Sequence, residues 1–178
     1  MLQPISIGAT PRRPHLTLHD LAGMTYAELE AMYRAAAAPA SLRAADGKLV
    51  GRMLAMRHAD RGLRGRWLRR LALSPSFIWE GKTLAAHADH AGGGYNRICL
   101  EGVLGRQHIF PFDSYLAPSQ FDHKPTIVID YDRPSNPWFM RRIRDELREL
   151  EPGLFLGLDM WKTKQRAVGL VWFALDGR

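Results

Sequence analysis

The sequence predicts a mainly β (α+β) protein: a single antiparallel β-barrel, or a strongly curved sheet, with an N-terminal helix and one late helix. From about Lys48 onward, short apolar or alternating segments are separated by turn signals at short intervals, as is typical of antiparallel sheets. Strands do not alternate regularly with helices, so the repeated units of a parallel sheet are not expected. The last two apolar segments, 152–161 and 168–175, are separated by a short basic turn. We expect them to form a closing antiparallel hairpin.

Length and composition fit one domain. The chain has 178 residues, 46% of them hydrophobic, which suffices for one ordinary core. We expect a single domain over 1–178, with an extended arm over 1–20 and the barrel over 45–176. No segment has the length and apolarity of a transmembrane helix, and the N-terminus lacks the pattern of a signal peptide. The single cysteine, Cys99, excludes an internal disulfide and a cysteine-based zinc site. We therefore expect a cytoplasmic protein without metal or cofactor.

The positive charge allows a nucleic-acid interpretation, because the net charge is +7. Most of it comes from arginine, with dense regions at 57–70 and 141–148. The second region is interspersed with acidic residues and is locally close to neutral. We therefore do not expect nucleic acid as the partner, and we favour attraction of an anionic small molecule.

A helix is predicted to begin at Thr25. Thr25 and Glu28 have the spacing of a capping box, in which each side chain satisfies a backbone amide near the helix start. Four residues then share one face at helical spacing: Leu29, Met32, Tyr33 and Ala36. Pro39 ends the helix, which is expected to pack on the outside of a sheet.

A strand over 48–56 and a basic amphipathic helix over 61–73 are expected next. Gly51 is a candidate bulge in the strand. In the helix, apolar residues recur every four positions while arginines lie elsewhere around it. A solvated face is the ordinary interpretation, and binding of an anion, a partner or a membrane surface is the alternative.

Four further strands are expected in the middle of the chain, over 77–84, 95–104, 107–116 and 126–131. The last is strongly β-branched and is predicted to be a central strand. The glycine run Gly92–Gly94 lacks the spacing of a dinucleotide-binding fingerprint. It is expected to be a flexible loop.

The late helix is predicted over 137–150. Asn136 and Pro137 suit an N-cap followed by proline at the first helical position. Five apolar residues then fit helical spacing: Phe139, Met140, Ile143, Leu147 and Leu150. A short helix that passes into a strand is the alternative.

The closing strand carries a candidate ligand-binding face. Because side chains alternate along a strand, one face is wholly apolar and the other holds Phe155, Gly157, Asp159 and Trp161. Aromatic rings, a carboxylate and a glycine that leaves room are typical of a pocket. A barrel of about eight strands can enclose one small ligand. The alternative places these residues on the outer face, with Asp159 solvated and the rings under the late helix.

Four residues are candidate catalytic groups, because a titratable side chain in a dry interior can acquire a shifted pKa: Asp159, Glu101, His108 and Tyr131. Glu101 has an ordinary interpretation as an edge-facing glutamate, and His108 as a core or rim histidine. His87, Asp89 and His90 form the densest histidine cluster, but the sequence does not require further ligands beside them. We therefore predict no metal site.

The candidate ligand-binding residues combine aromatic walls with cationic anchors. The walls are Trp79, Tyr95, Tyr115, Phe155 and Trp161, and the anchors are Arg97, Arg106 and Lys82. Arginine can hold a ligand carboxylate through two hydrogen bonds. Lys82 also has an ordinary interpretation, since it is expected to share one side of its strand with Glu80 and to form a surface ion pair with it.

The order of three short motifs resembles a known group of proteins. Trp79-Glu80-Gly81-Lys82 is followed by Val128 to Asp132 and then by Gly153 to Asp159. This order is similar to an uncharacterised bacterial family named for a G-x-W-x-G motif and taken to be lipocalin-like (calycin). Gly65-Arg66-Trp67 also matches the short G-x-W signature of lipocalins. The resemblance covers 45–176 and implies a barrel with a cavity for an apolar or amphiphilic small molecule. It transfers no catalytic residues.

Three functions remain open. The first is binding of a small hydrophobic or aromatic molecule, including anionic ones, inside a barrel. The second is a cofactor-free lyase, isomerase or cyclase acting on such a molecule, for which at least two of the candidate catalytic groups should converge. The third is an anion- or partner-binding module that uses the basic residues of 61–70. A homodimer is compatible with all three.

Overall fold

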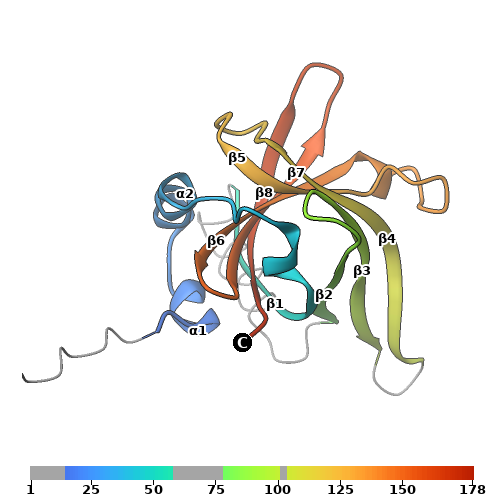
Figure 1. Cartoon of the computed structure of the whole chain (residues 1–178), viewed down its shortest axis with the longest axis horizontal. Helices are drawn as coiled ribbons and strands as arrows, with labels where there is room; N and C mark the ends of the chain where they lie inside the picture. Colours follow the sequence, from blue (N-terminus) through green and yellow to red (C-terminus); the bar gives the residue numbers. More distant parts are fainter. Residues whose placement is uncertain (1–14, 58–77, 101–103) are drawn as a thin grey trace, which may run out of the picture.

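Eight antiparallel strands form a closed barrel in which each strand pairs with the next along the chain and the last pairs with the first (Figure 1). This arrangement confirms the predicted fold class. The computed structural model describes residues 15–57, 78–100 and 104–178. The strands are β1 (Gly47–Met56), β2 (Trp79–Ala86), β3 (Ala91–Leu100), β4 (Gly105–Pro118), β5 (Pro125–Asp130), β6 (Ile143–Glu151), β7 (Leu154–Lys162) and β8 (Ala167–Asp176).

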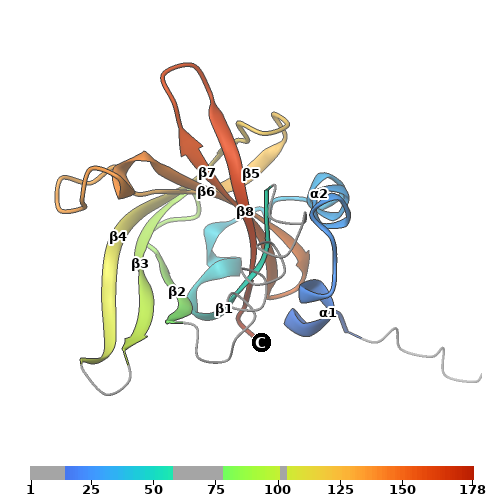
Figure 2. The ribbon, with the colours of Figure 1, turned by 180° about the vertical axis from the view of Figure 1, so that it is seen from behind.

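Two short helices, α1 (Leu18–Ala22) and α2 (Tyr26–Ala35), lie against one side of the barrel, as Figures 1 and 2 show from opposite directions. Both begin with a capping box, and the predicted one at Thr25 and Glu28 is confirmed. α1 begins within the segment expected to be an extended arm. The helices cover an outer apolar layer that includes Leu21, Leu29, Tyr33, Leu54, Leu154, Leu156, Leu158, Met160, Trp172 and Ala174.

A second apolar core fills the inside of the barrel. It is built from inward side chains of the strands and from the 3₁₀ segment η1 (Leu42–Ala45): Leu42, Ala45, Leu49, Leu84, Phe112, Ile127, Ile129, Tyr131, Leu147, Phe155, Phe173 and Leu175. η1 lies at the end of the barrel where β1 begins, and the backbone amide of Leu42 donates to the carbonyl of Asp89. This end of the interior is therefore closed by the chain itself.

The glycine run is part of β3, so the prediction of a flexible loop is wrong. A Cβ atom on Gly94 would lie 2.0 Å from the carbonyl oxygen of Thr83 and 2.7 Å from the ring of Phe112. A Cβ on Gly92 would lie 2.6 Å from the carbonyl oxygen of Ala85. The glycines are therefore required by close packing between neighbouring strands, a constraint that the local sequence does not reveal.

The late segment is a short 3₁₀ turn, η2 (Met140–Arg142), that passes directly into β6. The predicted helix over 137–150 is therefore wrong, because only Met140–Arg142 are helical, and the alternative of a short helix leading into a strand is confirmed. In the structure Glu146 and Arg148 are fully buried by ion pairs and hydrogen bonds outside the barrel.

Two further predictions concern the bulge in β1 and the basic helix. The irregularity in β1 lies between Met53 and Ala55, so Gly51 is not the bulge. The predicted basic helix over 61–73 lies entirely within 58–77, outside the described residues. No helix among the described residues is long and apolar enough to cross a membrane.

Candidate functional site

The polar face of β7 points into the barrel, and the apolar face lies under the helices. Phe155 belongs to the inner core, whereas Leu154 and Leu156 belong to the outer layer. The alternative in which Asp159 is solvated on the outer face is therefore wrong. Trp161 is half-buried near the end of β7, where it pairs with Ile143 of β6.

A group of polar side chains from five parts of the chain meets inside the barrel. We call it the interior polar cluster, and it comprises Trp79, Lys82, Asn96, Tyr131, Asp145 and Asp159. Its centre is the ammonium of Lys82, which is 3% exposed. Nζ donates to Asn96 Oδ1 at 2.9 Å and to the Tyr131 hydroxyl at 2.5 Å, and it forms an ion pair with Asp145 Oδ2 at 2.9 Å. Two of the three N–H donors of the ammonium are therefore used in hydrogen bonds, and its charge is paired with Asp145.

The remaining hydrogen bonds fix the orientation of the central groups. Asn96 Nδ2 donates to the Tyr131 hydroxyl at 3.0 Å, and Trp79 Nε1 donates to Asn96 Oδ1 at 3.0 Å. The Tyr131 hydroxyl in turn donates to Asp145 Oδ2 at 3.1 Å. Every polar atom of the asparagine side chain is therefore satisfied.

An irregularity in β2 explains why Lys82 is buried. The pairing of β2 with β3 shifts between Trp79 and Gly81, so that Trp79 and Lys82 both contact the inner cluster. Gly81 has a φ of +129°, and a Cβ there would lie 2.1 Å from the carbonyl oxygen of Leu49. The expected surface pair of Lys82 with Glu80 is wrong. Glu80 instead pairs with Arg106 at 2.9 Å, and Lys82 pairs with Asp145.

Aromatic rings surround the lysine ammonium. Nζ lies 5.2–5.8 Å from the ring centroids of Trp79, Phe112, Tyr131 and Phe173. Cations within about 6 Å of an aromatic face are attracted by the ring quadrupole, and more strongly so when desolvated. The barrel interior is therefore able to hold a buried positive charge.

Two carboxyl groups lie side by side at one edge of the cluster. Asp145 of β6 and Asp159 of β7 are directly opposite each other in the strand pairing, an arrangement that is unfavourable for two like charges. The Oδ1 atom of each is buried and has no hydrogen-bond partner among the described residues. Burial, followed by the charge of Asp145, raises the pKa of Asp159 to about 8, against the lowering effect of Lys82. At neutral pH Asp159 therefore keeps its proton.

The phenol of Tyr131 is also neutral. Its complete burial raises its pKa well above the usual value, and the negative charge of Asp145 acts in the same direction. The cluster thus contains one cation, one carboxylate, one protonated carboxyl group and one phenol, all within the apolar inner core.

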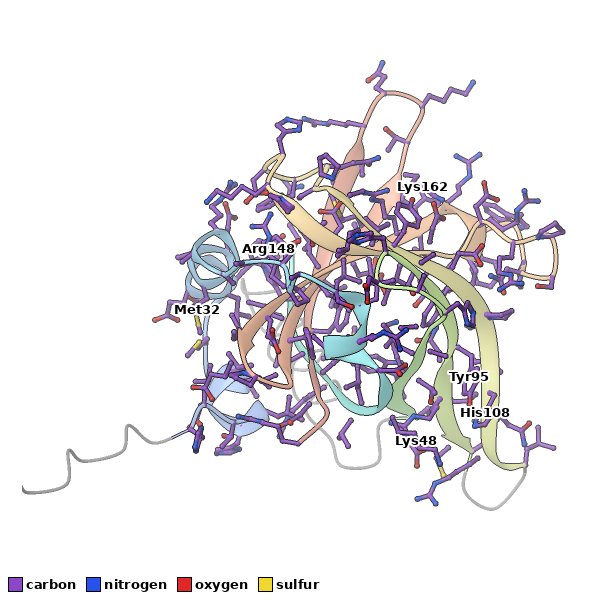
Figure 3. All side chains as sticks on the ribbon, in the orientation of Figure 1. Met32, Lys48, Tyr95, His108, Arg148 and Lys162 are labelled. Atoms are coloured by element: carbon purple, nitrogen blue, oxygen red, sulfur yellow. The ribbon has the colours of Figure 1, made fainter. Side chains whose placement is uncertain are left out.

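The other predicted site residues lie elsewhere. Tyr95 and His108 stack on each other with ring centroids 4.1 Å apart, side by side on β3 and β4 (Figure 3). Arg97 donates to the carbonyl oxygen of Leu49 at 2.7 Å. The Tyr115 hydroxyl lies 3.5 Å from Asp130 Oδ2. Glu101 lies outside the described residues.

The expected histidine cluster has structural contacts. Asp89 accepts hydrogen bonds from Ser41 and Arg43. Within 15–57, 78–100 and 104–178, no group of three or more histidine, cysteine, aspartate or glutamate side chains is arranged to hold a metal ion.

The sequence named Trp79, Lys82, Tyr131 and Asp159 separately, and the structure brings them together. Asn96 and Asp145 were missed. Asp145 was masked by the helical spacing of its segment, although its alternation with Ile143 and Leu147 matches an inward strand face. That period-two signal is the one that could have identified it.

Comparisons with known proteins support the fold. No family model matches the chain, and no curated protein matches it. A solved structure titled "Crystal structure of protein from Thermomonospora curvata" superimposes with a TM-score of 0.51 at 15% sequence identity, covering 86% of this chain and 87% of that one. At this identity the likeness concerns the fold alone. The chain is an eight-stranded antiparallel β-barrel, an architecture compatible with binding a small ligand.

Proposed function

We propose that this protein binds a small hydrophobic or aromatic molecule inside a lipocalin-like barrel, with the interior polar cluster contacting the polar group of that molecule. The observation that carries the proposal is the pair of buried, unpartnered carboxyl oxygens on Asp145 and Asp159. Leaving such an atom without a partner costs about 1–3 kcal/mol. Buried polar atoms in folded proteins are nearly always satisfied, so a ligand that supplies the missing hydrogen bonds is a functional explanation.

The apolar part of the ligand would contact side chains that line the inner core but keep partial exposure. These include Met53, Trp79, Phe110, Met140 and Ile143. They lie toward the strand ends opposite η1, so a ligand would enter there. Phe139, 43% exposed, lies 6.5 Å from Phe110 between ring centroids and would extend the apolar surface.

The chemistry of the cluster favours a ligand that donates hydrogen bonds. The Lys82 ammonium already contacts Asn96, Tyr131 and Asp145, and the unpartnered Oδ1 of Asp145 is an acceptor. The cationic anchors expected for an anionic ligand make other contacts. Arg97 binds a backbone carbonyl oxygen, and Arg106 pairs with Glu80. We therefore favour a neutral or donor-bearing ligand over an anionic one.

Two measurements test this proposal. Native mass spectrometry of freshly purified protein should detect a retained small molecule. In addition, ¹⁹F NMR of protein labelled with 5-fluorotryptophan should show that aromatic probes shift the signal of Trp79, which contacts the cluster, and leave that of Trp172, buried under the helices, unchanged. Signals can be assigned with single tryptophan-to-phenylalanine variants. Saturating probes that move neither signal, or only that of the exposed Trp138, would refute interior binding.

An acid–base enzyme is the second candidate, and the pKa of Asp159 favours it. A carboxyl group with a pKa of about 8 is protonated at neutral pH and can act as a general acid. Together with Tyr131 it meets the condition that two candidate catalytic groups converge. A cofactor-free lyase, isomerase or cyclase would lose turnover in Asp159→Asn while keeping ligand affinity. Turnover that survives this substitution would exclude Asp159 as the acid.

A further inference from the structure

We propose, on the basis of the proposed binding function, that the ligand is an aromatic or apolar amine whose protonated nitrogen binds between the carboxyl groups of Asp145 and Asp159. No other described pair of inward side chains combines two carboxyl groups in direct register with two unpartnered oxygen atoms. The inference names the chemical class of ligand that this arrangement would select.

Hydrogen-bond accounting excludes most other polar groups. Lys82 already donates two hydrogen bonds and is paired with Asp145, and Asn96 is satisfied at both its oxygen and its nitrogen. What remains unpartnered in the cluster are Oδ1 of Asp145, which is an acceptor, and Oδ1 of Asp159, whose carboxyl group carries a proton until a cation replaces it. A ligand carboxylate, ether or carbonyl group could accept the proton of Asp159 but would leave Oδ1 of Asp145 without a donor. The complementary group is a donor such as an amine or a hydroxyl.

Charge accounting favours the amine. The groups that face Asp159 are Asp145 from β6, Lys82 from β2 and Tyr131 beyond β5, and its partner on β8 is the apolar Val171. Two carboxyl groups thus share a single cation. A protonated amine supplies the second cation, so that the two carboxylates and the two ammonium groups alternate in sign. Its hydrogen bonds are charge-assisted, and such bonds are roughly twice as strong as neutral ones.

The aromatic surroundings favour the same class. Four rings already lie within 5.2–5.8 Å of the Lys82 ammonium: Trp79, Phe112, Tyr131 and Phe173. An interior that holds one desolvated ammonium among aromatic rings suits a ligand of the same type. Apolar walls would then hold the hydrocarbon part of the ligand.

Binding of such an amine is coupled to a proton. Without ligand, the interior keeps the proton on Asp159, and the bound ammonium takes its place. At pH 7, below the pKa of about 8, binding should therefore release close to one proton. Affinity should increase about tenfold per pH unit on approach to this pKa and level off above it.

Isothermal titration calorimetry with three matched probes tests the inference: 2-phenylethylamine, 2-phenylethanol and 3-phenylpropionate. Titrations in two buffers of different ionisation enthalpy give the number of protons released. The amine should bind at least about tenfold more tightly than the alcohol, and the acid most weakly. Asp159→Asn should abolish both the proton release and the preference for the amine. Glu80→Gln, which removes a carboxylate paired on the outside with Arg106, should change neither.

The outcomes separate this inference from the function on which it rests. If the alcohol binds as tightly as the amine, or if amine binding releases no proton, the amine inference is overturned while interior binding stands. If none of the three probes shifts the fluorine signal of Trp79, and no other aromatic probe does, the proposed function itself fails. Circular dichroism of Asp159→Asn confirms that the comparison is made on folded protein.

Discussion

Replacing Asp159 with asparagine should stabilise the folded protein at neutral pH, even though the residue belongs to the proposed site. A buried aspartate that forms an ion pair usually has a lowered pKa and stabilises the fold. Here the pKa is raised from 3.8 to about 8, chiefly by burial and then by the charge of Asp145. Between these values the unfolded chain loses the proton while the folded chain retains it. Ionisation therefore favours the unfolded state progressively as the pH rises.

The size of this stability difference follows from the interval between the unfolded pKa of Asp159 and the working pH. Each pH unit above the unfolded value lowers the free energy of unfolding by about 1.4 kcal/mol. From 3.8 to pH 7 this amounts to on the order of 4 kcal/mol. Above about pH 8 the penalty is constant, because both states are then ionised. An asparagine of nearly the same shape does not ionise, so the variant lacks this penalty and should gain most of that free energy.

Urea denaturation followed by tryptophan fluorescence provides the assay. The wild type and Asp159→Asn should have similar free energies of unfolding near about pH 4, and the variant should become progressively more stable toward about pH 8. Glu80→Gln serves as the control for removing a carboxylate outside the barrel interior. If Asp159→Asn is less stable than the wild type at pH 8, or if the difference does not change with pH, Asp159 is not protonated in the fold and the proton-coupling argument is wrong.

Three further substitutions test the packing around the site. Lys82→Met removes the cation from Asp145 and should cost about 3–5 kcal/mol in urea denaturation; a loss under about 1 kcal/mol would show that the pair is not buried. Gly94→Ala should disrupt the barrel signal in circular dichroism, because its Cβ would clash with the backbone of β2. The control Gly23→Ala should cost no more than about 1 kcal/mol. Equal effects of the two substitutions would contradict the close approach of β2 to Gly94. Arg148→Met leaves the buried carboxylate of Asp122 without its partner and should lower the free energy of unfolding by about 3–5 kcal/mol. An unchanged free energy of unfolding would contradict the Arg148–Asp122 ion pair.

Local signals predicted the barrel well. The β-branched run became β5, the closing hairpin became β7 and β8, and the capping box at Thr25 begins α2. These features depend on side-chain alternation or on atoms three residues apart, so the local sequence contains them. The composition of the closing strand also distinguished its two faces, although which face was inside remained open.

Non-local packing caused the errors. Gly92–Gly94 resembled a loop because three glycines weaken a strand, yet atoms of the neighbouring strands occupy the space that their side chains would need. Segment 143–150 resembled a helix because Ile143, Leu147 and Leu150 have helical spacing, yet most of its charged residues are buried. Their partners, such as Asp122 for Arg148, come from another part of the chain, and no local pattern announces them.

By itself, the sequence determined where apolar and polar side chains alternate along strands and where the strands are separated by turns. It also identified Trp79, Lys82, Tyr131 and Asp159 as candidate site residues. Only the tertiary structure decided that these residues meet. The β2 irregularity at Glu80 turns Trp79 and Lys82 to the same side, and strand register sets Asp159 opposite Asp145. The physical reason is that a pKa, an ion pair or an unpartnered oxygen depends on distances across a closed barrel. Those distances are fixed by how distant strands pair, which neighbouring residues in the sequence do not encode.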